Sequence, residues 1–173
     1  MTGLIDDLLD LSRIEVSEHR PPAGEVDLAA LCRAEAEALA PILATRQVRL
    51  DLHLAPATAR PADAGQLAQV LRNLVENAVR HGREGGTARL SAEARDGGVT
   101  LTVQDDGPGI GREHIPRLTE RFYRVDKGRS RAAGGTGLGL AIVRSIATRH
   151  GGAVTLGNGE KGARARVVLP LAA

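Results

Sequence analysis

Aromatic residues are almost absent from this chain, and their absence limits what its interior can be built from. The 173 residues include one Phe, one Tyr and no Trp, and the two aromatics are neighbours, Phe122 and Tyr123. A chain of this length buries roughly 70% of its unfolded surface, so it needs a sizeable core. We therefore expect an aliphatic core, whose helices and strands can be located from the spacing of Leu, Val, Ile and Ala.

Composition and charge are those of an ordinary globular domain. Hydrophobic residues make up 42% of the chain and charged residues 25%, and the formal net charge is +2. So small a charge argues against a nucleic-acid partner. No apolar run approaches the roughly 18 residues that span a bilayer, so we expect no membrane contact by this chain. The single cysteine, Cys32, excludes a disulfide within the chain and fits a cytoplasmic location.

Aliphatic periodicity divides the chain into alternating elements. Helices are predicted over four segments: residues 1–15, 26–44, 63–81 and 137–150. Strands are predicted over five: residues 48–54, 87–94, 99–104, 153–157 and 163–169. Asp27 is a candidate N-cap, and Pro41 should kink its helix or end it early. The order predicts an α/β (α+β) two-layer sandwich, with three main helices on one face of a mixed, largely antiparallel sheet of about five strands.

The N-terminal segments differ from the rest. An a/d-like apolar pattern begins at full strength, with no capping residue before it, at Met1, Leu4, Leu8 and Leu11. We interpret residues 1–18 as the C-terminal stub of a longer helix; an ordinary amphipathic helix is the alternative. Residues 19–26 carry two prolines and a glycine and are interpreted as a linker. Residues 27–173 would then form the main domain.

The helix predicted over 63–81 carries a polar stripe beside its apolar one. At 100° per residue, the core face holds Leu67, Leu71, Leu74, Val75 and Ala78. The neighbouring stripe holds Asn73, Asn77, Arg80 and His81. Amide oxygens one turn apart can ligate Mg²⁺ when substrate phosphates complete its shell, and Arg80 could face those phosphates. The alternative is an ordinary solvated helix face.

Two glycine-containing segments suggest ligand contacts. The sequence DDGPGI, residues 105–110, follows a predicted strand, and a carboxylate at Asp105 could accept a hydrogen bond from an exocyclic amine such as that of adenine. The sequence GGTGLGLAIV, residues 134–143, opens into a helix whose first N–H groups could bind phosphate. It is neither a Walker A loop nor a GxGxxG fingerprint. An ordinary turn and a flexible hinge are the respective alternatives.

In combination these segments resemble the catalytic, ATP-binding domain of bacterial sensor histidine kinases, within the GHKL superfamily. The matching sequences are NLVENAVRH, DDGPGI, ERFYRVDKGRSR and GGTGLGLAIV, in that order. RLTERFYRVDKGRSR followed by GGTGLGLAIV looks particularly like the phosphate-responsive sensor kinases. LIDDLLDLSRIE resembles the end of the dimerisation helix that precedes this domain.

The resemblance implies roles for individual residues. Asn77 would ligate Mg²⁺ with support from Asn73, and Arg124 would reach the γ-phosphate of ATP from a lid, residues 111–136. Asp105 would bind the adenine amine. The remaining ATP contacts would come from Arg80, His81, Gly107, Gly109, Ile110, Tyr123, Gly135, Thr136, Gly137, Leu138 and Gly139. Tyr123 is expected to sense nucleotide; the alternative is a static anchor at the base of the lid.

One departure from the family pattern bears on activity. None of the five histidines stands in the context of the family's phosphoacceptor, so the chain should bind ATP without phosphorylating itself. Its expected partners are the dimerisation and phosphotransfer domain of the parent kinase and a cognate response regulator. The parent kinase is expected to be anchored in the inner membrane. Alternatives are a GHKL-type ATPase, disfavoured because an amide, Asn73, stands where those enzymes carry a Glu, and a regulatory nucleotide-binding module.

Overall fold

The computed structural model describes residues 2–17, 20–126 and 134–170. Its centre is a five-stranded sheet of spatial order β2-β4-β5-β7-β6. In that order the strands are Arg49–Leu54, Thr87–Arg95, Gly98–Gln104, Ala163–Pro170 and Ala153–Asn158. β2 runs parallel to β4, and the other neighbouring pairs are antiparallel. The mixed, largely antiparallel sheet predicted from the sequence is confirmed.

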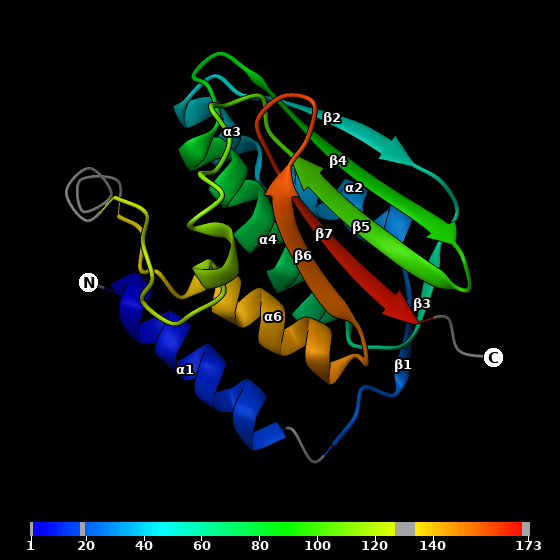
Figure 1. The fold of residues 1–173 in the computed structure, drawn as a ribbon. Helices are drawn as coiled ribbons and strands as arrows, with labels where there is room; N and C mark the ends of the chain where they lie inside the picture. The colour runs from blue at the N-terminus through cyan, green and yellow to red at the C-terminus, as the bar shows by residue number, and fades with distance from the viewer. Residues whose placement is uncertain (1, 18–19, 127–133, 171–173) are drawn as a thin grey trace.

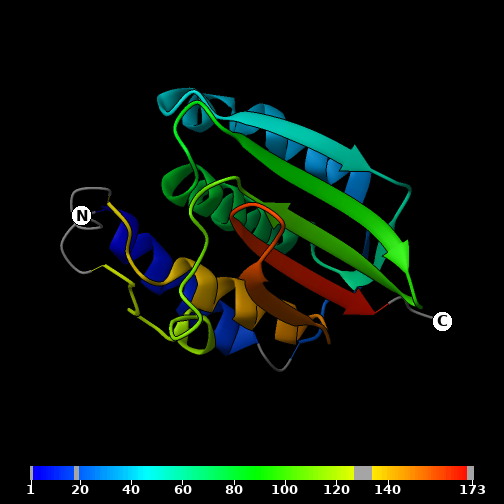
Figure 2. The same cartoon turned by 45° about the horizontal axis from the view of Figure 1, so that its top comes forward.

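Three helices cover one face of this sheet, as Figures 1 and 2 show. They are α2 (Leu28–Ala38), α4 (Ala64–His81) and α6 (Gly139–Arg149). The Asp27 side chain accepts a 3.0 Å hydrogen bond from the Ala30 N–H and so caps α2 as predicted. Pro41 lies in the first turn of a separate short helix, α3 (Ala40–Thr45), so the segment predicted as one helix ends early and restarts. A 3₁₀ turn, η2, spans Ile115–Arg117.

The core between sheet and helices is aliphatic, as expected. Side chains alternate along the strands, so that Leu90 and Leu101 are buried against the helices, as are Leu71 and Ile142 from the other side. Cys32 is buried among them, and this burial raises the pKa of its thiol to about 12. The thiol therefore stays protonated and unreactive at neutral pH.

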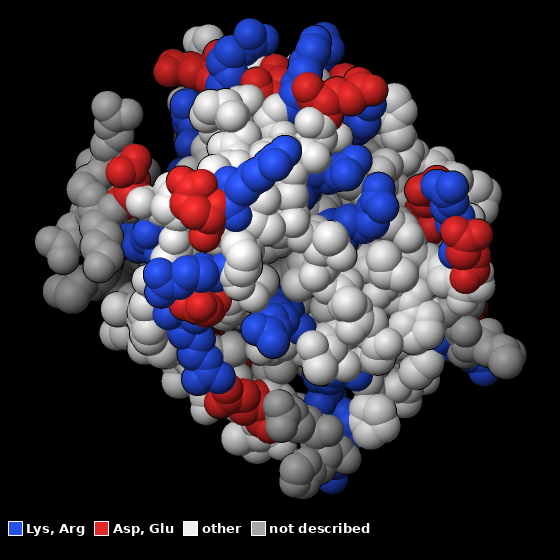
Figure 3. Space-filling model, in the orientation of Figure 1, with Lys and Arg blue, Asp and Glu red and all other residues white. Residues whose placement is uncertain are grey.

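The opposite face of the sheet is open and polar. Arg89 alternates with the buried Ala88 and Leu90 and therefore points away from the helices, and the strand register puts Arg164 and Arg166 on the same face. Figure 3 shows Lys and Arg side chains in the middle of this face and Asp and Glu mainly toward its margin. An antiparallel sheet with one solvated face is an ordinary arrangement, so this surface needs no covering layer.

A second, two-stranded sheet was not predicted. β1 (Gly24–Asp27) pairs antiparallel with β3 (Thr58–Ala62), and β1 begins inside the segment interpreted as a linker. Both strands are short and contain Gly, Ala or Pro, so neither carries a readable period-2 pattern. They exist because they pair across a long sequence separation. α6 also begins at Gly139 rather than at 137, because Gly137 has a positive φ of 77° that a right-handed helix excludes.

The N-terminal helix α1 (Thr2–Val16) packs on α6, on the side away from the sheet. Leu11 and Ile14 are buried there, whereas Leu4 and Leu8 of the predicted stripe remain exposed. The Gln69 amide of α4 donates to the Asp10 carboxylate at 2.7 Å. Among the described residues, no helix is long and apolar enough to cross a membrane.

Candidate functional site

α4 carries four of the predicted site residues on one face, called here the α4 polar face: Asn73, Asn77, Arg80 and His81. The helix starts at an Asp63 cap, whose carboxylate accepts from the Gln66 N–H at 2.9 Å, and its apolar stripe is buried. Asn73, Asn77 and Arg80 are half-buried and His81 is exposed. The polar face therefore borders the core along the middle and end of the helix, as the periodicity predicts.

The C-terminal end of α4 is a concentration of positive charge. The Arg46 guanidinium donates to the carbonyl oxygens of Val79 and Arg80, at 2.6 Å each, and so satisfies two helix-end acceptors. Although His81 is exposed at the surface, the protein atoms packed around its ring desolvate it and lower its pKa from the usual 6.5, and the neighbouring Arg80 charge lowers this pKa further. His81 is therefore neutral at pH 7, and its ring can offer both a donor and an acceptor.

Asp105 lies at the end of β5 in what we call the Asp105 turn, residues 105–110. Asp105 is 7% exposed. Oδ1 accepts backbone N–H groups from Gly107 at 2.8 Å and from Ala163 at 3.1 Å. Oδ2 accepts no hydrogen bond from any residue that the structure describes. One carboxylate oxygen is thus held by the fold, and the other is available to a ligand.

The Asp105 turn is pressed against the end of α4. A Cβ added at Gly107 would lie 2.6 Å from the His81 carbonyl oxygen, and one at Gly82 would lie 3.2 Å from the Asp105 Cβ. Glycine is therefore required at Gly107 for backbone approach. This contact places Asp105 and the α4 polar face on the same side of the molecule.

The adjacent carboxylate, Asp106, has a different task that the sequence did not reveal. It accepts the Thr87 N–H at 2.9 Å and pairs with Arg83 at 3.4 Å, so it ties the Asp105 turn to the loop between α4 and β4. A Cβ at Gly86 would collide with its Oδ1. The sequence shows two neighbouring Asp residues, and only the long-range contacts separate their roles.

The glycine-rich segment, residues 134–139, meets the α4 polar face from the other direction. A Cβ at Gly139 would lie 3.3 Å from the Asn73 Oδ1, and one at Gly135 would lie 3.1 Å from Arg80 Nη1 and 3.4 Å from Arg124 Nη2. Three expected site residues and two expected glycines therefore come together here. No side chain caps the start of α6, so its first N–H groups lack a side-chain acceptor.

Two residues of this segment have contacts that the sequence did not predict. The Thr136 hydroxyl donates to the Asp7 carboxylate of α1 at 2.5 Å and accepts the Leu138 N–H at 3.2 Å. Leu138 itself is fully buried, so its side chain belongs to the core and only its backbone can face a ligand.

The segment predicted as a lid is described over residues 111–126 and 134–136, and 127–133 lie outside the described residues. The Tyr123 hydroxyl bonds to Nδ1 of His114 at 2.6 Å, and the Arg117 guanidinium lies 4.3 Å from the Tyr123 ring centroid. Tyr123 thus has partners within its own segment. Phe122, 56% exposed, has a positive φ of 64°, and its N–H donates to the Gly137 carbonyl at 2.9 Å.

Arg124 carries an unusual feature. Its Nη2 is buried and has no hydrogen-bond partner within the part of the chain that the structure describes. An unpaired buried donor of a charged group is costly, so it points to an acceptor that a ligand would supply. The atom lies beside Gly135, at the start of the segment leading into α6.

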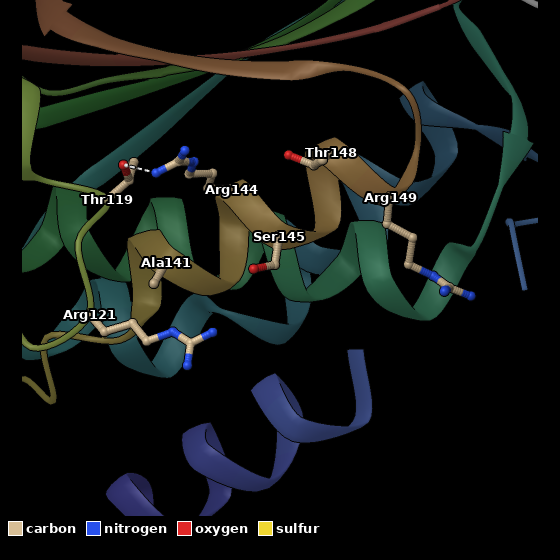
Figure 4. Close-up of a pocket in the computed structure, with 7 residues that line it drawn as sticks. All are labelled: Thr119, Arg121, Ala141, Arg144, Ser145, Thr148 and Arg149. Atoms are coloured by element: carbon tan, nitrogen blue, oxygen red, sulfur yellow. Dashed lines mark hydrogen bonds between the residues drawn. The ribbon is translucent and has the colours of Figure 1, made fainter. Parts of the chain in front are cut away.

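A groove of about 590 Å³ on the outer side of α6 is separate from these residues. Figure 4 shows Arg144 reaching toward Thr119 and Arg149 extending in the opposite direction along the helix. Arg121 pairs with Glu15, and Arg149 donates to the Ser17 carbonyl. None of the predicted nucleotide-site residues lines this groove.

The described residues include no preformed cluster of charged or sulfur-containing metal ligands. Within residues 2–17, 20–126 and 134–170, no group of three or more His, Cys, Asp or Glu side chains could hold a metal ion. The amides of Asn73 and Asn77 remain the candidate oxygen donors on α4.

Comparison with known proteins places these features in a family. Residues 62–173 match the HATPase_c model, described as histidine kinase-, DNA gyrase B- and HSP90-like ATPase. The phosphate regulon sensor protein PhoR of Pseudomonas aeruginosa is 42% identical over 154 residues, which cover 87% of this chain and 34% of PhoR. The chain thus spans about a third of the length of such curated relatives.

Solved structures agree with this assignment. The histidine kinase AdeS of Acinetobacter baumannii superposes with a TM-score of 0.78 at 25% identity, covering 99% of this chain and 79% of that one. Full-length ShkA, in complex with AMPPNP, superposes with a TM-score of 0.79 at 31% identity, covering 99% of this chain and 36% of that one. The chain therefore belongs to the family of histidine kinase-, DNA gyrase B- and HSP90-like ATPases, and its fold is that of sensor histidine kinase catalytic domains.

Proposed function

We propose that this chain binds ATP with Mg²⁺ and transfers the γ-phosphoryl group to a histidine on the dimerisation domain of a sensor kinase. The observation that carries the proposal is the presence in one site of a carboxylate with one free oxygen and a guanidinium with one unpartnered nitrogen. Asp105 presents a free Oδ2 beside the C-terminal end of α4, and Arg124 presents a buried Nη2 beside Gly135 and Arg80. A nucleoside triphosphate offers an amine donor to the first and phosphate oxygens to the second.

The phosphate end has further support in its charges and backbone. Arg80 and Arg124 both approach Gly135, and α6 begins close by without a side-chain cap. Helix N-terminal N–H groups and guanidinium groups both bind phosphate oxygens. The similar protein ShkA was solved in complex with AMPPNP, an ATP analogue, and this supports a nucleotide at the equivalent site here.

The catalytic contribution of this chain is positioning and charge stabilisation. Mg²⁺, with Asn77 as a ligand and Asn73 in support, would neutralise charge that develops on the phosphates. The bond between the γ-phosphorus and the bridging oxygen breaks, a bond to an imidazole nitrogen forms, and ADP leaves. Arg124 would hold the transferred group in line, which is the main requirement of phosphoryl transfer.

Phosphotransfer is favoured over ATP hydrolysis by the residue at position 73. The Asn73 side chain faces the start of α6, and an amide cannot take a proton from an attacking water. The similarity to sensor kinases also supports phosphotransfer over hydrolysis. We accordingly propose a dimerisation and phosphotransfer domain and a response regulator as partners.

The test is phosphate transfer in trans. The chain is incubated with Mg²⁺, ATP labelled at the γ-phosphate and a separately supplied dimerisation domain of the parent kinase. We expect acid-labile, alkali-stable phosphate on that domain, and none on the chain incubated alone. Rapid phosphate release without labelling of the acceptor would favour the ATPase alternative. Absence of nucleotide binding by calorimetry would contradict both.

A further inference from the structure

A residue outside the predicted site, at the end of the edge strand β6, holds the Asp105 turn. Asn158, the last residue of β6, makes two hydrogen bonds with the backbone of Ile110: its Oδ1 accepts the Ile110 N–H at 2.8 Å, and its Nδ2 donates to the Ile110 carbonyl at 2.9 Å. An amide side chain that bonds both the N–H and the C=O of one residue makes the same two hydrogen bonds as a neighbouring β-strand would. It therefore fixes the position of that backbone segment, not merely its distance.

The clamp explains the second glycine of the turn. A Cβ at Gly109 would lie 2.7 Å from the Asn158 Oδ1, and Gly109 has a φ of 80°, which favours glycine. The Asn158 amide therefore occupies the space that any other side chain at this position would need. Gly109 shapes the turn by admitting this amide as well as by leaving room for a ligand.

The same connection between β6 and β7 holds the turn at its other end. Ala163, the first residue of β7, exchanges hydrogen bonds with Asp105: its N–H donates to Oδ1 at 3.1 Å and its carbonyl accepts the Asp105 N–H at 3.0 Å. Both ends of the Asp105 turn are thus attached to one β6–β7 connection.

We infer that Asn158 is a positioning residue for nucleotide-base recognition, an assignment that rests on the proposed function. It does not touch the reacting groups; it keeps the Asp105 turn in the geometry that receives the base. Asn158 is exposed and outside the aliphatic core, so its amide is not needed to fill the interior. The described hydrogen bonds of its side chain go to Ile110 alone.

The size of the effect follows from populations. Apparent affinity falls in proportion to the fraction of molecules in the binding-competent geometry. If the turn without its clamp adopts that geometry about a tenth of the time, the dissociation constant for ATP rises about tenfold. The lost affinity should come from contacts with the base. The ratio between the affinities for ATP and for inosine triphosphate, which has a carbonyl in place of the amine, should therefore become smaller.

The experiment compares Asn158→Ala with Glu160→Ala in the whole chain. Glu160 lies in the same connection, is exposed, and makes no hydrogen bond or ion pair with the residues that the structure describes. Calorimetry should show about tenfold weaker ATP binding for Asn158→Ala and wild-type binding for Glu160→Ala. Asn158→Asp keeps the acceptor for the Ile110 N–H but loses the donor, so it should bind with intermediate affinity.

Amide hydrogen exchange tests the clamp without nucleotide. The Ile110 N–H should be protected in the free wild-type chain and should exchange about tenfold faster in Asn158→Ala. Unchanged exchange and unchanged ATP affinity would overturn the inference. So would a loss that is equal for ATP and inosine triphosphate and accompanied by a lower thermal midpoint, because that describes a generally loosened domain. If the wild-type chain binds no ATP, the proposed function fails, while the exchange result still decides whether the clamp exists.

Discussion

The two ends of the candidate nucleotide site differ in how far the free protein already satisfies their polar groups. At the base end, Asp105 accepts two backbone N–H groups, and its neighbour Asp106 accepts a third from Thr87. At the phosphate end, Arg124 keeps a buried Nη2 without a partner among the described residues, and α6 starts without a side-chain cap. At the base end the fold already holds the carboxylates and leaves only the Asp105 Oδ2 free, whereas at the phosphate end a buried charged donor is still unsatisfied.

This difference separates stability from function. Residues at the base end stabilise the free protein as well as the complex, because their hydrogen bonds already exist. At the phosphate end, the buried Nη2 of Arg124 should weaken the free protein, because a buried charged donor without an acceptor is costly. Substitutions at the two ends should therefore move thermal stability in different directions while both weaken ATP binding.

The largest effect is expected for Asp105→Ala. Loss of a hydrogen bond to a charged group corresponds to about 1.5–3 kcal/mol, so ATP affinity should fall roughly 10- to 100-fold. Two backbone N–H groups also lose their acceptor, which costs about 1–3 kcal/mol each, so the thermal midpoint should fall. Calorimetry and thermal unfolding measure the two effects. The chain should remain folded; equal ATP affinity in both proteins would remove Asp105 from base recognition.

Asp105→Asn is the matched control for that comparison. An amide can keep the accepting oxygen toward Gly107 and Ala163 while presenting N–H donors where Oδ2 stood. Stability should therefore stay near that of the wild type, although ATP affinity falls as in Asp105→Ala. If stability and affinity fell together in this variant too, the two tasks of the carboxylate would not be separable.

Arg124→Ala tests the phosphate end, with an expected loss of about tenfold in ATP affinity. Adenosine affinity should change little, since adenosine carries no phosphate. The thermal midpoint of the free chain should stay level or rise, because the substitution removes a buried unpaired donor. Calorimetry with both ligands and thermal unfolding are the measurements. A lower midpoint would contradict the contrast between the two ends.

His150 gives a smaller, pH-dependent effect at the helix that carries the phosphate end. It is 3% exposed; its Nδ1 donates to the Ile146 carbonyl and its Nε2 accepts the Asp63 N–H. Burial lowers its pKa below the usual 6.5, so the unfolded chain binds the proton more readily. The free energy of unfolding should therefore be unaffected by this group above pH 6.5 and fall as pH drops below it, by at most about 1.4 kcal/mol per pH unit.

Denaturant unfolding of the wild type and His150→Gln between pH 7.5 and 5.5 measures this contribution. The variant should lose less stability over that range, whatever its starting value. Parallel pH profiles would show that His150 does not carry the acid sensitivity.

The smallest expected effect is a change in the emission of Tyr123, the only tyrosine in the chain. Phosphates bound near Arg124 should shift the neighbouring Tyr123, so emission should change more with an ATP analogue and Mg²⁺ than with ADP. The contacts of Tyr123 with His114 and Arg117 limit how far it can move. Identical emission and anisotropy in the free, ADP-bound and analogue-bound chain would make it a static anchor.

Sequence reasoning reached the parts of the molecule that depend on residue type. Long aliphatic patterns predicted α4 and the five strands of the main sheet. The amides, the carboxylate and the glycines of the site could be predicted because each residue type has a known chemistry. It missed the pairing of β1 with β3, because neither strand has enough residues to show a period. It also missed the hydrogen bonds by which Ala163 and Asn158 support the Asp105 turn. The Ala163 contact uses a backbone N–H, which nearly every residue has, so no residue type indicates it. The Asn158 contact depends on the register of β6 and β7 against β5.

The hydrogen bond from Phe122 to Gly137 has a consequence for chain length. Both residues have positive φ, and the bond brings together the two ends of the segment 123–136. A loop whose ends are already joined can be lengthened at small entropic expense, about 0.6 kcal/mol for each doubling. Insertions and deletions that leave Arg124, Gly135 and Thr136 in place should therefore be tolerated by the fold, so the length of the chain between them can vary while the described sheet and helices stay the same.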